Sequence, residues 1–331
     1  MEKDVCIIPY FGKFPNYWKL WLKSAVNNED YDFYIFTDSK LEVSFPNIKV
    51  INIQFEKFKA LLQSKVSFKI NLKRPYKLCD YKPMYGLALF NYIKEYPYWG
   101  FCDIDVILGD LNKFLTKPML EGYDKIYHLG HMTLLKNNQK CNLLWKSKHH
   151  INGPNSPYRY DEAFKTPYVC NFDEDHGFTQ IAENSNIKCY YSTDYADLDY
   201  TRFNFFMLNT KFENYPSVFK WKNGKLLAYY FKSGELQFNE VAYVHLQKRK
   251  MKILCKVTED GFMIVPNQFI SIKDIEGVLE TNKYKHLYIE YKRKRLQMII
   301  KHIQQHAIQQ RIYRLFFKKI YRFLLDRRST R

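Results

Sequence analysis

Long apolar runs are missing from this sequence of 331 residues. No window of about 18 residues, the length that a membrane-spanning helix needs, is free of charged side chains. The apolar run Val5–Ile8 near the N-terminus is also too short for the core of a secretory signal peptide. We therefore expect a cytoplasmic protein without a membrane-spanning helix.

Paired cysteines and a glycine-rich loop are missing too. The seven cysteines are odd in number, scattered, and never spaced as Cys-x-x-Cys, which argues against a disulfide framework and against a zinc site. The first predicted strand is followed by Pro9-Tyr10-Phe11-Gly12 rather than by a glycine-rich phosphate loop. That absence counts against a sugar-phosphate nucleotidyltransferase, an alternative that the α/β pattern described below would otherwise allow.

Acidic residues are scarce at the C-terminal end. Residues 283–331 contain 15 Lys and Arg against two acids, a balance of +13, so the preceding 282 residues carry only +5 of the net charge of +18. Apolar residues at helical spacing between these cations predict basic amphipathic helices. Such helices either lie on an anionic membrane surface, at the inner face of the cell membrane, or pack on the rest of the chain. We place a domain boundary at 270, with domains 1–270 and 271–331.

The basic composition, with a pI of about 9.3, also raises the alternative of a nucleic-acid-binding protein. The charge is concentrated in the C-terminal segment, and the rest of the chain contains no recognised nucleic-acid-binding motif. A nucleic-acid partner is therefore the less favoured interpretation.

The body of the chain is rich in hydrophobic residues (46%), which indicates a folded globular protein. The pattern predicts strands at Val5–Pro9, Phe33–Phe36 and Ile48–Ile53, with a helix at Asn16–Val26. This order is typical of an α/β fold with a parallel sheet, in which ligands bind at the carboxyl ends of the strands. The segments expected to meet at that edge are Pro9–Gly12, Thr37-Asp38 and Asp103/Asp105. Further along the chain, the pattern predicts a helix at Gln139–Lys146, a long polar loop at Lys148–Tyr168 and a hairpin at Asn223-Gly224.

Asp103 and Asp105 follow the apolar run Tyr98–Cys102. In an extended strand, residues two apart point to the same face, so these carboxylates would repel each other unless a divalent cation lay between them. The same Asp-x-Asp spacing recurs at Asp197/Asp199, in a segment that we interpret as a polar loop without function.

Lys77–Tyr96 is predicted to be a helix, with Pro83 near its start or at a kink, and it leads into the strand before Asp103. The order of these features resembles the GT-A-fold glycosyltransferases, and more narrowly the bacterial enzymes of capsule and surface-polysaccharide assembly. The matching stretches are Ile7–Gly12, Tyr76–Gly86, Asp103–Asp105, Gly130–Lys136, Asp173–Gly177 and His245–Met251.

The resemblance implies a Rossmann-related, mixed sheet flanked by helices, and a metal-bridged nucleotide-sugar donor. It implies Mn²⁺ or Mg²⁺ on Asp105 and His245, with Asp103 contacting the metal or the ribose. The donor-binding residues expected from the strand ends and from the resemblance are Pro9, Tyr10, Phe11, Thr37, Asp38, Asp80, Lys82, Asp103, Lys248 and Lys250. The family has Arg where this chain has Pro83, which weakens the implied role of Lys82.

Acceptor chemistry is expected at Asp173–Gly177. Glu174 or Asp175 would act as the general base that takes a proton from the acceptor hydroxyl, and Glu174 is preferred. A base at this place favours inversion of the anomeric centre over retention. Gly130–Thr133 would line the acceptor side. The sequence thus predicts a metal-dependent hexosyltransferase that uses a nucleotide sugar, of the UDP type, and a lipid-linked glycan acceptor.

Overall fold

The computed structural model describes residues 2–147, 158–175, 177–200, 202–209, 215–247 and 249–281, together with 292, 293, 296, 297 and 300. The chain divides into two compact units, one of residues 1–200 and 204–282 and the other of residues 201–203 and 283–331. The predicted basic amphipathic helices fall almost entirely outside the described residues, so the domain boundary at 270 stays a prediction. Among the described residues, no helix is long and apolar enough to cross a membrane.

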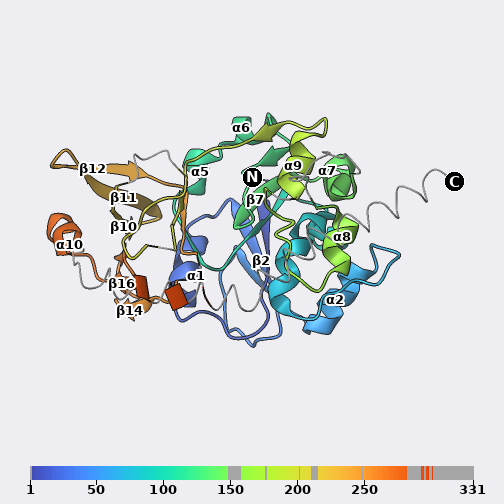
Figure 1. Ribbon diagram of the computed structural model, residues 1–331, viewed down its shortest axis with the longest axis horizontal. Helices are drawn as coiled ribbons and strands as arrows, with labels where there is room; N and C mark the ends of the chain where they lie inside the picture. Colours follow the sequence, from blue (N-terminus) through green and yellow to red (C-terminus); the bar gives the residue numbers. More distant parts are fainter. Residues whose placement is uncertain are drawn as a thin grey trace. The chain divides into compact units, whose positions relative to one another are not determined.

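A seven-stranded mixed sheet forms the centre of the first unit (Figure 1). Its strand order is β3-β2-β1-β4-β7-β6-β8; the first four strands are parallel, and β7 runs antiparallel to both β4 and β6. The predicted α/β class, a mixed sheet flanked by helices, is confirmed. The strands are β1 (Asp4–Pro9), β2 (Tyr31–Thr37), β3 (Ile48–Asn52), β4 (Tyr98–Cys102), β6 (Lys125–Ile126), β7 (Met132–Lys136) and β8 (Cys189–Tyr190).

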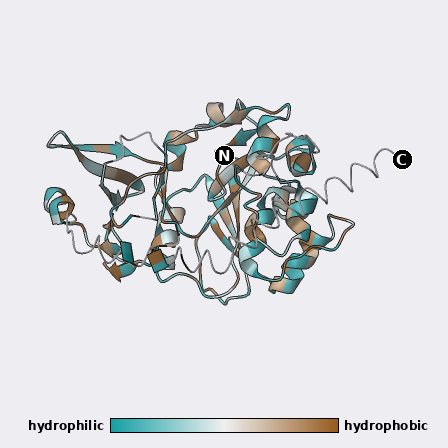
Figure 2. Cartoon of the chain, in the orientation of Figure 1, coloured by the Kyte–Doolittle hydropathy of each residue, from teal (hydrophilic) through white to brown (hydrophobic). Residues whose placement is uncertain are grey.

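Strand β1 explains why both faces of this sheet are covered. Alternate residues point to opposite faces, and Cys6 and Ile8 join one hydrophobic core while Val5 and Ile7 join another. Helix α1 (Trp18–Val26) packs into the first core, and α2 (Phe55–Gln63), α8 (Tyr160–Lys165) and α9 (Phe178–Glu183) pack into the second. Figure 2 shows hydrophobic and hydrophilic residues side by side on α2, as expected for a helix with one buried face.

Two smaller sheets complete the first unit. A three-stranded sheet has the order β5-β13-β9 and joins three distant segments: β5 (Val106–Leu108), β13 (Tyr243–His245) and β9 (Ala196–Asp197). A six-stranded sheet has the order β12-β11-β10-β15-β16-β14. It consists of β10 (Ser217–Lys222), β11 (Lys225–Lys232), β12 (Glu235–Glu240), β14 (Lys252–Leu254), β15 (Gly261–Val265) and β16 (Gln268–Ile270). Asn223-Gly224 makes the predicted β10–β11 hairpin, with both residues at positive φ.

Two predictions of local structure were wrong. The segment Lys77–Tyr96 is not one helix but a 3₁₀ helix, η1 (Pro75–Met84), followed by the short helices α3 (Tyr85–Ala88) and α4 (Phe90–Ile93). Pro83 lies inside η1 and has no N–H to donate, which disfavours a regular α-helix there. The segment predicted as a loop from 148 to 168 contains helix α8, whose start is fixed by the Glu162 carboxylate accepting from the Arg159 N–H at 2.9 Å.

The remaining helices are short and lie between the strands. They are α5 (Leu111–Phe114), α6 (Lys117–Glu121), α7 (Gln139–Leu143), the 3₁₀ helix η2 (Leu144–Lys146) and α10 (Ile275–Thr281). The expected helix at Gln139–Lys146 is therefore present as α7 and η2 together.

Asp4, at the start of β1, makes the stability of the fold depend on pH. Burial raises the pKa of its carboxyl to about 7, whereas an unfolded chain has the ordinary value of 3.8. Because the folded state binds the proton more tightly, its stability falls as pH rises from about 4 through 7. Relative to Asp4→Asn, the wild type should lose about 1–4 kcal/mol of unfolding free energy across this window. Urea denaturation at pH 4 and pH 8 measures the difference, and a pH-independent gap between the two proteins would contradict it.

Candidate functional site

Asp103 and Asp105 lie in the turn between β4 and β5 rather than in an extended strand. We expected strand alternation to place both carboxylates on one face. That reason was wrong, because the two residues lie in a turn. The turn is held by the Asp103 N–H, which donates to the His131 carbonyl at 2.8 Å, and by the Leu246 N–H, which donates to the Asp105 carbonyl at 2.8 Å. The two carboxylates nevertheless come together with His245, and one ligand atom from each of the three lies within 4.8 Å of the others.

His245 is placed by the three-stranded sheet. Strand β13 lies between β5 and β9, so His245 is opposite Val106 on one side and Asp197 on the other. Its Nε2 lies 3.5 Å from Asp105 Oδ1, and its Nδ1 lies 2.7 Å from Asp197 Oδ1. Burial alone would lower the pKa of His245, but the carboxylates of Asp105 and Asp197 raise it to about 10.

Asp197 is a residue of the candidate site that the sequence interpretation missed. We expected it in a polar loop, but it lies in β9 with 4% of its surface exposed. Its Oδ1 also accepts a hydrogen bond from Gln247 Nε2 at 2.8 Å. No local pattern could have revealed this, because the residues that meet Asp197 are about 50 positions further along the chain.

The chemistry of these residues fits a divalent cation. Two carboxylates and one imidazole nitrogen are suitable ligands for Mn²⁺ or Mg²⁺, and Asp197 would fix the orientation of the His245 ring from outside the ligand set. A cation there would also relieve the repulsion between Asp103 and Asp105. Asp103, Asp105 and His245 are hereafter the acidic metal cluster.

Lys82 connects the acidic metal cluster to the segment before α9. Its Nζ lies 2.7 Å from Asp103 Oδ1 and 3.1 Å from Asp173 Oδ2, and it donates to the Gly130 carbonyl at 2.8 Å. Burial would lower the pKa of Lys82, but the two carboxylates raise it well above its usual value. In this structure Lys82 contacts only protein groups among the described residues, and its donor-binding role stays a prediction.

Asp173 and Glu174 extend the site beyond the metal cluster. Asp173 is 2% exposed; it lies in the expected acceptor segment but was not predicted to have a role of its own. Burial raises the pKa of its carboxyl despite the nearby Lys82. Glu174 is half-buried, and its pKa is also raised by burial, with a further contribution from the negative charge of Asp103. Asp175 is exposed. Burial and the raised pKa favour Glu174 as a proton acceptor, and the role of either residue as the base stays a prediction.

Gly130 permits the close approach of these groups. A Cβ atom at this position would lie 2.2 Å from Asp173 Oδ2, the oxygen that contacts Lys82. The expected acceptor-side segment Gly130–Thr133 is therefore in contact with Asp173, and its first residue has to be small.

Gly130→Ala should displace the Asp173 carboxylate from Lys82 and cost about 1–3 kcal/mol of stability through overpacking. Ligand binding at the site should weaken as well, because Lys82 and Asp103 would shift with the carboxylate. Gly277→Ala in α10 is the matched control, since its Cβ would meet only the far end of the Asp274 side chain. Thermal melts of both variants test this, and equal melting temperatures would contradict it.

The surroundings of Asp80 differ from those expected of a residue that binds the nucleotide-sugar donor. It is fully buried, and its oxygens accept from the N–H groups of Cys170 and Phe172 at 3.0 Å and from Lys77 Nζ at 2.7 Å. These bonds tie η1 to the segment that leads to Asp173. In this conformation Asp80 positions that segment, and its donor-binding role stays a prediction.

Two of the three strand-end segments that were expected to meet do so directly. The Tyr10 N–H donates to the Phe36 carbonyl, and the Gly12 N–H donates to Asp38 Oδ1 at 3.2 Å, so the segments after β1 and β2 lie side by side. Burial, with a smaller contribution from the charge of Asp105, raises the pKa of Tyr10, whose hydroxyl donates to the Lys13 carbonyl at 3.3 Å. Pro9 is half-buried, and Phe11 and Thr37 are buried. Lys250 is exposed, and Lys248 lies outside the described residues.

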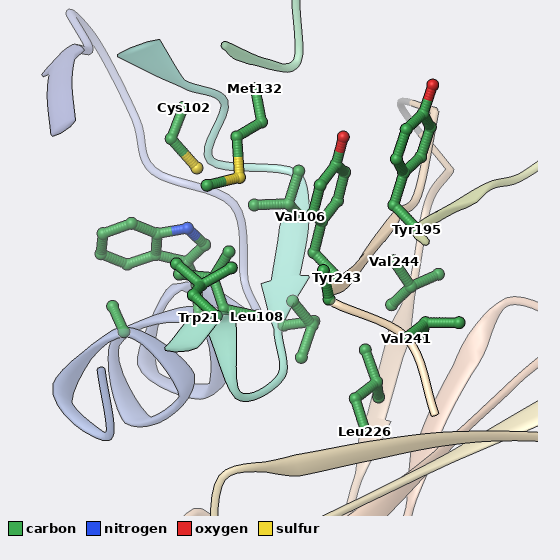
Figure 3. Close-up of a cluster of buried hydrophobic side chains, with 14 of the residues drawn as sticks. Trp21, Cys102, Val106, Leu108, Met132, Tyr195, Leu226, Val241, Tyr243 and Val244 are labelled. Atoms are coloured by element: carbon green, nitrogen blue, oxygen red, sulfur yellow. The ribbon is translucent and has the colours of Figure 1, made fainter. Parts of the chain in front are cut away.

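His131 packs directly against His245, with ring centroids 4.3 Å apart. Burial, with a smaller contribution from His245, lowers the pKa of His131 well below its usual value. Tyr195 and Tyr243 lie beside it, with centroids 5.3 and 5.4 Å from the His131 ring. Figure 3 shows these two tyrosines next to each other with their hydroxyls pointing the same way.

Comparison with known proteins gives one match by sequence. A model of a family of unknown function, DUF6625, matches residues 6–273. Among curated proteins, none matches this chain.

Two solved structures are similar to parts of the chain. One is a crystal structure of the galactosyltransferase LgtC in complex with donor and acceptor sugar analogues, with a TM-score of 0.34, 13% identity, and coverage of 59% of this chain and 75% of LgtC. The other is an active-site mutant of LgtC, with a TM-score of 0.27, 14% identity, and coverage of 40% of this chain and 57% of the mutant. At such TM-scores neither structure carries an argument about this chain.

Proposed function

We propose that this chain, which belongs to the DUF6625 family of unknown function, is a metal-dependent glycosyltransferase. The observation that carries the proposal is the convergence of Asp103, Asp105 and His245 at the edge of an α/β sheet, with Lys82 joining Asp103 to Asp173. An enzyme that transfers a sugar from a nucleotide sugar needs a way to neutralise a diphosphate leaving group. It also needs a carboxylate near the sugar, and this site contains groups for both tasks.

The acidic metal cluster would hold Mn²⁺ or Mg²⁺, which supplies a positive charge for the diphosphate oxygens of the donor. The donor nucleotide would lie along the segments after β1 and β2, at Pro9, Tyr10, Phe11, Thr37 and Asp38. This placement follows the rule that ligands of open α/β sheets bind at the carboxyl ends of strands. Lys248 and Lys250, which follow β13, would contribute charge to the departing diphosphate.

Lys82, Asp173 and Glu174 would form the sugar side of the site. Their charged groups can hydrogen-bond to sugar hydroxyls, and Lys82 bridges the carboxylates of Asp103 and Asp173. Glu174 would take the proton from the acceptor hydroxyl as its oxygen bonds to the anomeric carbon and the bond from that carbon to the diphosphate breaks. This direct displacement inverts the anomeric centre.

The substrates that we propose are a UDP-linked hexose and a lipid-linked glycan of a capsule or other surface polysaccharide. The basic segment 283–331 supports a lipid-linked acceptor, because a cationic amphipathic segment favours an anionic membrane surface. The enzyme would then act at the cytoplasmic face of the cell membrane as a peripheral protein.

Calorimetric titration of UDP and GDP, each with and without Mn²⁺, tests this function on the wild type and on Asp105→Ala. We expect UDP to bind only with Mn²⁺, and the variant to lose at least about 100-fold in affinity, since a bound metal contributes several kcal/mol to such sites. Lys59→Ala, on the exposed surface of α2, is the control that should bind like the wild type. If neither nucleotide binds under any condition, the assignment of the acidic metal cluster fails, and binding of nucleic acid by the basic segment should be measured instead.

A further inference from the structure

Several buried polar atoms next to His245 have no hydrogen-bond partner within the described part of the chain. They are Nδ1 and Nε2 of His131, Nδ1 of His128, and the hydroxyls of Tyr127, Tyr195 and Tyr243. The rings that carry them are in mutual contact, at centroid distances of 4.9 to 6.4 Å. Buried polar groups nearly always have hydrogen-bond partners in folded proteins, so this group of buried polar atoms indicates a binding site for an ion or a ligand.

His131 is the most informative member of this group. Its side chain is buried, and neither of its ring nitrogens has a partner among the residues that the structure describes, whereas an ordinary buried histidine donates from one nitrogen and accepts at the other. A nitrogen of His131, an oxygen of Asp197 and a nitrogen of His245 all lie within 4.8 Å of one another. The residues are 3%, 4% and 8% exposed, so this set lies deeper than the acidic metal cluster, in which Asp103 has a side chain 35% exposed.

We propose that His131, Asp197 and His245 form a second metal site, which takes a Zn²⁺-type transition-metal ion. Two imidazoles and one carboxylate are a ligand set that Zn²⁺ and Co²⁺ accept readily. Mg²⁺ prefers oxygen ligands, so the nitrogen-rich set distinguishes this site chemically from the acidic metal cluster. The site is defined by its own ligands and stands whether or not the chain transfers a sugar.

The close contact of His245 Nδ1 with Asp197 is also what a carboxylate–histidine pair without metal would show. That pair, however, leaves His131 without a partner, whereas a cation among the three residues gives His131 one. The hydroxyls of Tyr195 and Tyr243, which lie together beside His131, offer hydrogen-bond partners for water bound to such an ion (Figure 3).

His245 belongs to both sets of ligands. A neutral imidazole has one nitrogen available as an acceptor, and here Nε2 faces Asp105 while Nδ1 faces Asp197. As a neutral ligand, His245 can therefore serve one site at a time. A metal ion in the buried site would compete with an ion in the acidic metal cluster.

The test uses the full chain after removal of metal by a chelator, with Co²⁺ as the probe. The variant Asp103→Asn/Asp105→Asn removes two ligands of the acidic metal cluster and leaves the buried set intact. We expect it to bind one equivalent of Co²⁺, detected by calorimetry and by visible absorption without the charge-transfer band of a thiolate ligand. Adding His131→Gln should weaken this binding by more than about 100-fold, because even changes outside a ligand set cost 10- to 100-fold.

His128→Gln is the matched control, because His128 is a neighbouring histidine with an unpartnered nitrogen but is not one of the three ligands. It should bind Co²⁺ like its parent. As a second readout in the wild-type background, Zn²⁺ should raise the melting temperature of the chain, and His131→Gln should abolish that rise. Either of two results would overturn the second site: the Asp103→Asn/Asp105→Asn variant fails to bind Co²⁺ at all, or adding His131→Gln to it leaves the affinity for Co²⁺ unchanged. Neither outcome depends on nucleotide binding, which tests the catalytic proposal separately.

Discussion

Glu174→Gln should lower kcat for sugar transfer by about 10²–10⁴-fold, the range that a positioned general base contributes. The amide keeps the size of the side chain but cannot accept the proton of the acceptor hydroxyl. Donor binding should change little, because the acidic metal cluster and Lys82 are untouched. The measurement is kcat and KM with a UDP-sugar that the wild type uses, together with calorimetric binding of UDP and Mn²⁺.

Two further variants test whether Glu174 is the base. Glu183→Gln, at the exposed end of α9, should retain wild-type activity and controls for loss of a carboxylate in the same region. If Asp175→Asn shows the large loss and Glu174→Gln does not, the base is Asp175. If neither variant loses more than a few-fold, the inverting mechanism with a base at this segment is wrong, since a retaining enzyme does not need a base there.

Lys82→Met should destabilise the fold by about 3–5 kcal/mol, the usual cost of removing one partner from a buried ion pair. Asp173 is 2% exposed and would be left as a buried carboxylate without its cation. Asp103 would suffer less, because about a third of its side chain is in contact with solvent. Guanidinium denaturation measures the loss, with the slope against denaturant checked for two-state behaviour.

The ion pair between Lys59 and Glu56 in α2 is the control for the buried ion pair between Lys82 and Asp173. Lys59→Met removes an exposed partner of Glu56 in α2 and should cost less than about 1 kcal/mol, as surface pairs generally do. The double variant Lys82→Met/Asp173→Asn should recover most of the lost stability, since no uncompensated charge then remains buried. A loss for Lys82→Met no larger than that for Lys59→Met would show that Lys82 does not compensate Asp173.

The elements that sequence reasoning predicted correctly are those with strong local patterns. Continuous apolar residues in β1 and β2 identify strands covered on both faces, and Asn223-Gly224 identifies a hairpin. The interruption of the helix expected at Lys77–Tyr96 was predicted only in part. Pro83 signals a disturbance, but the sequence does not say that the backbone forms a 3₁₀ helix and two short α-helices.

The residues of the candidate site also fall into those that the sequence predicted and those that only the structure brought together. By itself the sequence determined the α/β class and the pair Asp103/Asp105, because apolar runs and residue spacing are local properties, while His245 as a candidate ligand came from the resemblance to GT-A-fold glycosyltransferases. Only the tertiary structure decided that Asp197 holds His245, that Asp173 meets Lys82 and that the His131 ring packs against His245. These contacts depend on the pairing of β5, β13 and β9 and on the fold of the segment before α9, which join residues 48 to 139 positions apart. Packing free energy fixes such long-range contacts, and no local spacing in the chain encodes them.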